Sequence, residues 1–111
     1  MSDVNTELIV RDNNESSSYD ALIGDKVVGR IIYERGHDLA GRRIIVRSTV
    51  VDPTMRGHGI GSKLVKAALD DVRAQGATLT SYCSFVDEYV ADHQEYADLV
   101  DRTHPGRLYQ G

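Results

Sequence analysis

The chain has 111 residues, with 17 acidic and 13 basic side chains and a formal net charge of −4 at pH 7. This length predicts a single domain over residues 1–111, with one packed core and ordered structure over about residues 6–103. The mild acidity, without a run of lysine or arginine, argues against nucleic acid and anionic membranes as partners. No apolar run approaches the roughly 20 residues of a membrane helix, and the N-terminal sequence lacks the features of a signal peptide. With one cysteine and hence no internal disulfide, we expect a cytoplasmic monomer.

The first half of the sequence predicts four β-strands. Strand-forming residues gather in short runs, separated by turn formers, over residues 7–11, 18–23, 26–34 and 42–51. Gly24 and Asp25 form a two-residue hairpin signal between the second and third runs, and residues 35–41 turn the chain again. Because every connection is short, the four strands are expected to form an antiparallel meander.

A helix and a fifth strand follow. Apolar residues recur at helical spacing from Leu64 to Val72, and Gly76 marks the end of this helix. Residues 77–83 then have the composition of a strand. Because a helix joins the fourth and fifth strands, these two are expected to be parallel neighbours in a right-handed crossover.

A second helix is predicted from Ser84. This residue stands three positions before Asp87, which is the spacing of a capping box, and apolar residues recur along one side up to the stop at Pro105. Residues 106–111 are expected to be a loose tail. The predicted fold class is therefore α/β, with a mixed five-stranded sheet and two helices.

Three glycines, Gly57, Gly59 and Gly61, alternate between the fourth strand and the first helix. Glycine permits positive φ and close approach of the backbone, and a helix N-terminus presents free N–H groups at the positive end of its dipole. This combination indicates a phosphate ligand. The Walker loop does not fit, because Ser62 separates Gly61 from Lys63, and the dinucleotide fingerprint does not fit, because its third glycine is missing. A different pyrophosphate-binding loop is indicated.

The stretch VVDPTMRGHGIGSKLV resembles the acetyl-coenzyme A loop of the GCN5-related N-acetyltransferases. Arg56, Gly59 and Gly61 fill the pattern of that loop, in which Arg or Gln precedes two residues, Gly, one residue and Gly or Ala. The resemblance implies that backbone N–H groups of the loop hold the pyrophosphate and that the edge of the preceding strand binds the pantetheine arm. It assigns to the cofactor Thr49, Val50, Val51, Arg56, Gly57, His58, Gly59, Ile60, Gly61 and Ser62. Arg56 either contacts a phosphate or is simply exposed, and His58 is expected to act through its backbone more than its ring.

A second motif, CSFVDEYVADHQEY, resembles a small subgroup of this family in which a cysteine ends the fifth strand and an aromatic helix follows. Larger relatives place two helices between their first two strands, where these helices wall the acceptor site. Residues 12–17 are too few for such helices, so the acceptor side is expected to be open. The chain also departs from the subgroup, because Ser48 and Thr49 stand where its members tend to carry a His-Thr pair.

Cys83 and Tyr89 are the candidate catalytic residues. Cys83 closes the fifth strand beside a helix N-terminus, a position that can favour the nucleophilic thiolate form of a cysteine; the alternative is a small buried hydrophobe. The resemblance places Tyr89 near the tyrosine that reprotonates the departing coenzyme A thiolate in larger relatives; the alternative is a core aromatic. His93 is expected to pack or cap, and His37 and His104 lie in predicted loops without the spacing of a metal site.

The resemblance implies acetyl-coenzyme A as cosubstrate, no metal, and transfer of the acetyl group to an unknown amine, with protein and peptide amines among the candidates. A backbone N–H near Val51 is expected to hold the oxygen that gains charge during the transfer. The alternative is an acyl-coenzyme A binding or sensing module with little transferase activity, which the missing acceptor wall and the missing His-Thr pair favour. An interaction protein without coenzyme A is hard to reconcile with the loop.

Overall fold

The structure is a computed structural model that describes residues 8–38, 41–102 and 106, without the side chains of residues 37 and 38. Its five strands form one sheet in the order β1-β2-β3-β4-β5. They are β1 (Leu8–Asn13), β2 (Ser18–Ile23), β3 (Lys26–Asp38), β4 (Gly41–Val51) and β5 (Thr78–Ser81). The first three pairings are antiparallel and β4 pairs with β5 in parallel, so the predicted mixed sheet is confirmed.

The third strand is longer than predicted. β3 runs on through Gly36 and His37, where a turn is expected, because its register with β4 continues to the pair of Asp38 and Gly41. Gly36 stands opposite Arg43, and a Cβ at Gly36 would come within 3.3 Å of the Arg43 guanidinium. The glycine thus makes room for a cross-strand side chain, and the prediction that His37 lies in a loop is wrong.

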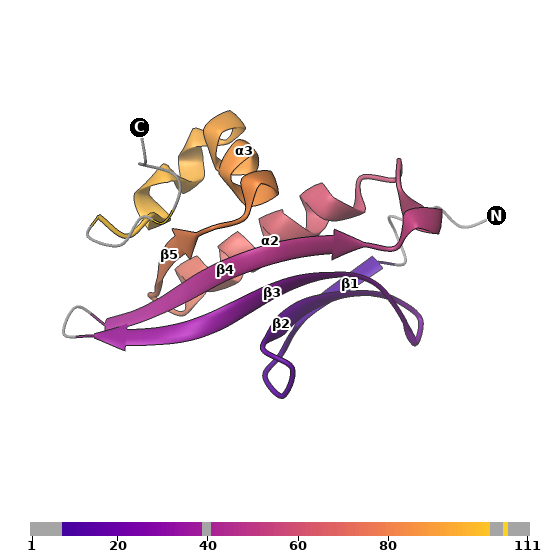
Figure 1. The fold of residues 1–111 in the computed structure, drawn as a ribbon, viewed down its shortest axis with the longest axis horizontal. Helices are drawn as coiled ribbons and strands as arrows, with labels where there is room; N and C mark the ends of the chain where they lie inside the picture. The colour runs from indigo at the N-terminus through magenta and orange to yellow at the C-terminus, as the bar shows by residue number, and fades with distance from the viewer. Residues whose placement is uncertain (1–7, 39–40, 103–105, 107–111) are drawn as a thin grey trace.

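The core lies between one face of the sheet and two helices. α2 (Ile60–Ala74) runs along this face, and α3 (Ser84–Asp92) lies on the same side (Figure 1). The buried side chains of α2 are Ile60, Leu64, Val65, Ala68, Leu69 and Val72, as the helical spacing predicts. The buried sheet residues beneath the helices include Tyr19, Ala21, Val28, Ile31, Tyr33, Ile44 and Val46. Each large aliphatic side chain buried in this way contributes about 1.5–3 kcal/mol relative to exposure.

The second predicted helix is interrupted. α3 ends at Asp92, His93 has φ −131° and ψ 76°, and the chain continues as a 3₁₀ helix, η2 (Gln94–Leu99). The prediction of one helix up to Pro105 is therefore wrong. No glycine or proline marks the break, and Val90 and Tyr96 on its two sides are both buried in the same core, so the apolar spacing conceals it.

The face of the sheet opposite the helices carries exposed side chains. Arg30, Ile32 and Glu34 alternate along β3 and are exposed there, as is Val50 of β4. The connection between β1 and β2 is a turn over residues 14–17, as predicted, and it is too short to cover this face. None of the helices in the described ranges combines the length and the apolar character needed to cross a bilayer.

One residue of the predicted tail pairs with the sheet. Gly106 forms a parallel bridge with Ser81, so the expectation of a loose tail is wrong at this position. A Cβ on Gly106 would lie 2.2 Å from the Ser81 carbonyl oxygen, so no larger residue fits without movement of the backbone. The rest of the predicted tail, residues 107–111, lies outside the described residues.

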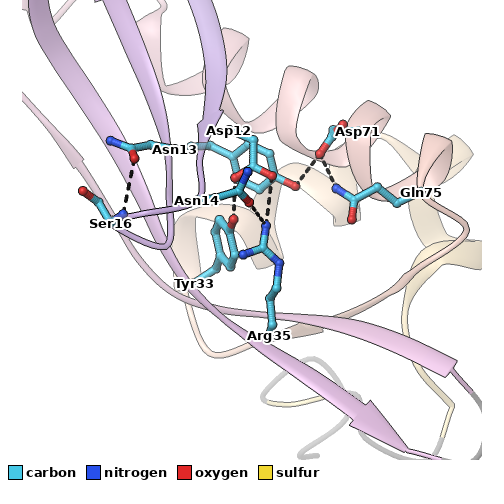
Figure 2. A network of polar contacts seen from close by, with 9 residues as sticks. Asp12, Asn13, Asn14, Ser16, Tyr33, Arg35, Asp71 and Gln75 are labelled. Carbon is cyan, nitrogen blue, oxygen red and sulfur yellow. Dashed lines mark hydrogen bonds and ion pairs between the residues drawn. The ribbon is translucent and has the colours of Figure 1, made fainter.

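A polar network ties the β1–β2 turn to β3 and α2 (Figure 2). The Tyr33 hydroxyl donates to the Asp12 carboxylate, which also accepts from Arg35 at 3.1 Å. On the helix side, the Tyr19 hydroxyl donates to Asp71 at 2.8 Å. Burial is the main cause that raises the pKa of both tyrosines, and the hydrogen bonds to their carboxylate partners raise it further. Both hydroxyls therefore remain protonated and act as donors.

Candidate functional site

β4 and β5 separate part of the way along β4. Their ladder joins only residues 43–46 to residues 78–81, and the Tyr82 N–H makes a last bond to the Val46 carbonyl at 2.9 Å. β4 then runs on to Val51 without β5 beside it (Figure 1). Because β5 ends at Ser81 and not at residue 83 as predicted, the gap between the strands opens early.

The backbone of β4 at Thr49 and Val51 faces this gap. A bulge at Arg47 shifts the register between β3 and β4, and beyond it the Asp52 N–H donates to the Val28 carbonyl at 2.8 Å. In an antiparallel pair, every second residue directs its N–H and C=O to the same neighbour. The backbone groups of Thr49 and Val51 therefore point away from β3, toward the side that β5 has left.

Asp52 fixes the start of the loop that follows β4. Its carboxylate accepts from the Thr54 N–H at 2.9 Å and the Thr54 hydroxyl at 2.8 Å, and it pairs with Lys26 at 3.3 Å. Asp52 is thereby the N-cap of a 3₁₀ helix, η1 (Pro53–Met55). The hydrogen bonds from Thr54, aided by Lys26, hold the pKa of Asp52 below its ordinary value. The sequence Asp52-Pro53-Thr54 is a recognisable turn signal. Asp52 was nevertheless not among the site residues predicted from the sequence.

The loop enters α2 through two glycines with positive φ. Gly57 has φ +89° and Gly59 has φ +73°, and a Cβ on either would meet no atom within 4 Å. Glycine is needed at these two positions because of the positive φ, since a larger side chain would have room there. Gly59 is the N-cap of α2, where no side chain of the described residues caps the first turn and no acidic residue lies within it. The first N–H groups of α2 thus have no side-chain cap among the described residues, and the helix dipole there favours an anion.

Gly61 is needed for a different reason. A Cβ there would lie 2.8 Å from the ring of Phe85, which reaches across from the first turn of α3. The ring is 40% exposed and forms part of the wall of a cleft. Phe85 was not predicted as a site residue. The spacing of apolar residues in α3 does not show which of them line the cleft and which are buried in the core.

The cleft lies between β4, the glycine loop and the start of α2, and has a volume of about 400 Å³. The residues that line it are Thr49, Val51, Met55, Arg56, Gly57, Gly59, Ile60, Gly61, Ser62 and Phe85. All the predicted cofactor residues except Val50 and His58 are in this set. Val50 is 55% exposed and lines a hollow on the opposite face, and His58 is exposed on the loop. The assignment of these residues to a cofactor stays a prediction.

Cys83 lies behind the cleft. The residue is only 7% exposed, and its Sγ is 3.3 Å from the hydroxyl of Thr49, which lines the cleft. The Cys83 N–H donates to the Ser81 hydroxyl at 3.3 Å. Cys83 is also the N-cap of α3, so the predicted capping box is wrong, because Ser84 is already helical and no side chain caps the turn. The thiol thus lies at a helix N-terminus, and its catalytic role stays a prediction.

Tyr89 packs within the C-terminal half of the protein and does not line the cleft. Its ring stacks on His93, with 3.9 Å between centroids and 10° between planes, and lies 6.1 Å from the Tyr96 ring. Nδ1 of His93 is 2.8 Å from the Tyr89 carbonyl oxygen, which agrees with the packing role expected of this histidine. Burial raises the pKa of Tyr89, and Lys66 lowers it only in part, so the hydroxyl is protonated at neutral pH. Its role as a proton donor stays a prediction.

Within residues 8–38, 41–102 and 106, no three side chains of His, Cys, Asp or Glu gather in the way that a metal site requires. His104, which was expected to lie in a loop, falls outside these ranges.

One comparison with known proteins identifies a family. The sequence model described as GCN5-related N-acetyl-transferase matches residues 18–99. No curated protein matches the sequence.

Among solved structures, an aminoglycoside acetyltransferase, meta-AAC0020 from an uncultured soil metagenomic sample in complex with sisomicin, has a TM-score of 0.54 at 22% identity, over 70% of this chain and 53% of its own. Integron cassette protein HFX_CASS3, from the mobile metagenome of Cole Harbour Salt Marsh, has a TM-score of 0.52 at 23% identity, over 67% and 52%. Arabidopsis thaliana Naa50, in complex with the bisubstrate analogue CoA-Ac-MVNAL, has a TM-score of 0.50 at 26% identity, over 70% and 60%.

The chain spans little more than half the length of the first two of these structures and 60% of the third. At their level of identity, the first two show a shared fold and nothing more. The family match shows more than a shared fold, because the matched residues 18–99 contain β2 to η2 and every described residue that lines the cleft. With four of the five strands, the glycine loop and the separated strands β4 and β5 all inside that match, the chain belongs to the GCN5-related N-acetyltransferase family.

Proposed function

We propose that this protein binds acetyl-coenzyme A in the cleft between β4 and α2 and transfers the acetyl group to an amine. One observation carries the proposal: the uncapped N-terminus of α2 and the strand edge at Thr49 and Val51 meet in the same cleft of about 400 Å³. N–H groups at a helix N-terminus suit a pyrophosphate, and an unpaired strand edge suits an extended chain with amide groups. The family match and the analogue bound to Naa50 support the same ligand.

In this proposal each part of the site has a physical task. Bound acetyl-coenzyme A supplies an activated thioester. The backbone of residues 57–62 holds the pyrophosphate, and the edge of β4 orients the arm so that the thioester reaches the gap near Thr49 and Cys83. The Val51 N–H, which points into the gap, stabilises the oxygen that gains charge. Tyr89 is retained as a candidate proton donor because its hydroxyl is protonated.

The acceptor amine is proposed to approach from the open face of the sheet. Val50 lines a hollow of about 410 Å³ on that face, while its neighbours Thr49 and Val51 line the cleft. The hollow and the cleft are therefore separated only by the thickness of β4. Ile32 and Val50, which are 41% and 55% exposed, give the hollow an apolar floor. An extended peptide that presents an N-terminal or lysine amine suits this surface.

The charges around the hollow argue for a peptide over a polycationic amine such as an aminoglycoside. Carboxylates here are already paired: Asp20 with Arg30 at 3.1 Å, Glu34 with Arg47 at 3.0 Å and Asp52 with Lys26 at 3.3 Å. A polycation would have to compete with these cations for each of these three carboxylates. The peptide portion of the analogue bound to Naa50 favours the same acceptor class.

The ligand assignment is tested with two substitutions of one residue. Gly59→Glu and Gly59→Gln impose the same backbone strain at φ +73°, but only the first places a negative charge at the helix N-terminus. Acetyl-coenzyme A at 100 times its Kd should stabilise the parent by about 2.7 kcal/mol in thermal unfolding, because stabilisation follows occupancy. Gly59→Glu should lose this stabilisation and Gly59→Gln should keep more of it. Equal stabilisation of Gly59→Glu and the parent would refute the assignment.

The activity is tested by following acetyl-coenzyme A consumption with a panel of acceptors. We expect turnover with peptides that carry a free N-terminus or a lysine, and weaker turnover with aminoglycosides. Turnover confined to one small amine would contradict the open acceptor site. Binding without turnover for any acceptor in the panel would instead favour a binding or sensing module.

A further inference from the structure

A second pocket lies at the other end of α2 from the cleft, and we propose that it binds a small anion of the phosphate class. Its volume is about 280 Å³, and the residues that line it are Arg35, Gly36, Arg42, Arg43, Ile44 and Gln75. None of them lines the cleft. Because α2 has 15 residues and is about 22 Å long, an anion in this pocket would not touch a ligand in the cleft.

The charge of the pocket is the first argument. Every charged residue among its described lining is an arginine, although the chain as a whole has a net charge of −4. Like charges gathered at one place repel one another, and a bound anion relieves that repulsion. The planar guanidinium with its fork of N–H donors matches phosphate oxygens in pairs, so arginines indicate this ligand class more strongly than lysines would.

The position of Arg35 is the second argument. Its guanidinium donates to Asp12 at 3.1 Å and to Asn14, and it lies 5.1 Å from the centre of the Tyr33 ring (Figure 2). These contacts hold the side chain in place before any ligand arrives. A guanidinium has five N–H donors, so the contacts with Asp12 and Asn14 leave donors for an anion.

The other two arginines come from β4. Gly36 leaves the space that the Arg43 guanidinium occupies, since a Cβ at Gly36 would lie 3.3 Å from Nε and from Nη2 of Arg43. Arg43 has a further interaction of its own, and its positive charge adds to that of the pocket. Arg42 is exposed and forms no hydrogen bond or ion pair with the described residues.

The carboxylates of Asp12 and Asp71 are engaged by other residues. Asp12 accepts from Tyr33 and from Arg35, and Asp71 of α2 accepts from Tyr19 and from Gln75 (Figure 2). Neither carboxylate lines the pocket. Among the described residues that line it, the pocket therefore offers an occupant guanidinium groups and the side chain of Gln75.

The test uses the full chain with coenzyme A present in excess, so that phosphate cannot bind at the glycine loop. Inorganic phosphate is titrated while the N–H signals of the arginine side chains are followed by NMR, with sodium chloride of equal ionic strength as reference. Phosphate should shift the Arg35 and Arg42 signals in a saturable way. Arg42→Gln should weaken phosphate binding about tenfold, as expected for loss of one charge-assisted hydrogen bond. Arg11→Gln, which removes an exposed arginine of β1, should leave the affinity unchanged.

A second titration with glycerol 3-phosphate separates free phosphate from a phosphate ester, and saturable binding of either one supports the site. The proposal is overturned if chloride produces the same shifts, or if Arg42→Gln and Arg11→Gln weaken binding equally. The outcome does not depend on acetyl transfer, because no acceptor is present. If coenzyme A fails to bind, the arginine signals still report on the pocket while signals of residues 57–62 report on the loop.

Discussion

The thiol of Cys83 and the hydroxyl of Thr49 lie 3.3 Å apart at the gap between β4 and β5. Thr49 lines the cleft, whereas Cys83 is buried behind it. The Cys83 thiol can therefore affect a ligand in the cleft in two ways: by reaching the ligand next to the Thr49 hydroxyl, or by orienting that hydroxyl. Two roles for Cys83 are separable on this basis: a nucleophile that reaches the ligand after a small movement, and a buried partner that orients Thr49.

Cys83→Ala should lower the free energy of unfolding by about 1 kcal/mol. It should lower turnover by more than this loss of stability explains. Thr49→Ser keeps the hydroxyl and should retain most activity, whereas Thr49→Val removes it and should not. Turnover rates are compared with the free energies of unfolding from urea titrations. Turnover of Cys83→Ala equal to that of the parent would reduce Cys83 to core packing.

Mass spectrometry of the parent mixed with acetyl-coenzyme A alone separates the two roles. Acetylated Cys83 indicates a covalent step: the Cys83 sulfur loses its proton and bonds to the acetyl carbon, the bond from that carbon to the coenzyme A sulfur breaks, and coenzyme A takes up the proton and leaves as the thiol. An unmodified parent that still turns over indicates direct transfer, with Cys83 positioning Thr49.

Gly61→Ala should weaken coenzyme A binding while the protein stays folded. The added Cβ would lie 2.8 Å from the far end of the Phe85 ring, which is 40% exposed and is free to turn outward. The gain in helix propensity, at most about 1 kcal/mol, offsets part of the cost of that movement. Calorimetric titrations with coenzyme A measure the change. In a Phe85→Ala background, Gly61→Ala should add no further loss, and an additive loss would show that the ring does not mediate the effect.

Asp52→Ala should weaken coenzyme A binding more than Asp52→Asn does. Alanine removes both hydrogen bonds from Thr54, whereas an asparagine oxygen can still accept them. The matched control is Lys26→Gln, which breaks only an exposed ion pair and should leave the affinity nearly unchanged. The Kd values of the three variants are measured under one set of conditions. If Lys26→Gln weakened binding as much as Asp52→Ala, the ion pair and not the cap would hold the loop.

Asp20 should make the stability depend on pH. Burial alone would raise its pKa, but hydrogen bonds from Ser18 at 2.7 Å and Asn13 at 3.0 Å, together with Arg30 at 3.1 Å, reverse this and leave the pKa below its ordinary value. The stabilisation is therefore fully present above the unfolded pKa of about 3.9 and is lost as the pH falls through the lower folded value. Asp20→Asn should cost about 1–3 kcal/mol at pH 7.

The measurement for Asp20 is urea unfolding of the parent and Asp20→Asn between pH 3 and pH 7. The difference between them should shrink below about pH 4, where the carboxylate of the unfolded chain becomes protonated. A difference that stays constant over this range would mean that the side chain contributes by shape and not by charge.

The sheet and the glycine loop were predictable because their signals are local. Positive φ at Gly57 and Gly59 is a property of those residues, and the alternation of glycines before a helical pattern reveals it. The meander follows from short connections, such as the turn at Gly24. The family resemblance added the ligand, which phosphate-loop reasoning alone left open.

Features that depend on packing between distant segments were not predictable. Phe85 becomes part of the cleft only because the first turn of α3 brings its ring against Gly61 of α2. The break at His93 has no local signal, because both flanking segments bury their side chains in one core. The arginines of the second pocket meet because β3 continues past the expected turn to pair with β4.

The early end of β5 has a consequence for the protein without its ligand. Backbone groups of Thr49 and Val51 form a short free edge inside the sheet, and free edges invite pairing with another chain. A pantetheine arm bound along this edge would occupy those groups as a missing strand would. The supply of the proposed cosubstrate would then govern resistance to aggregation as well as the rate of reaction. The protein without bound cosubstrate would self-associate more readily than the protein with it.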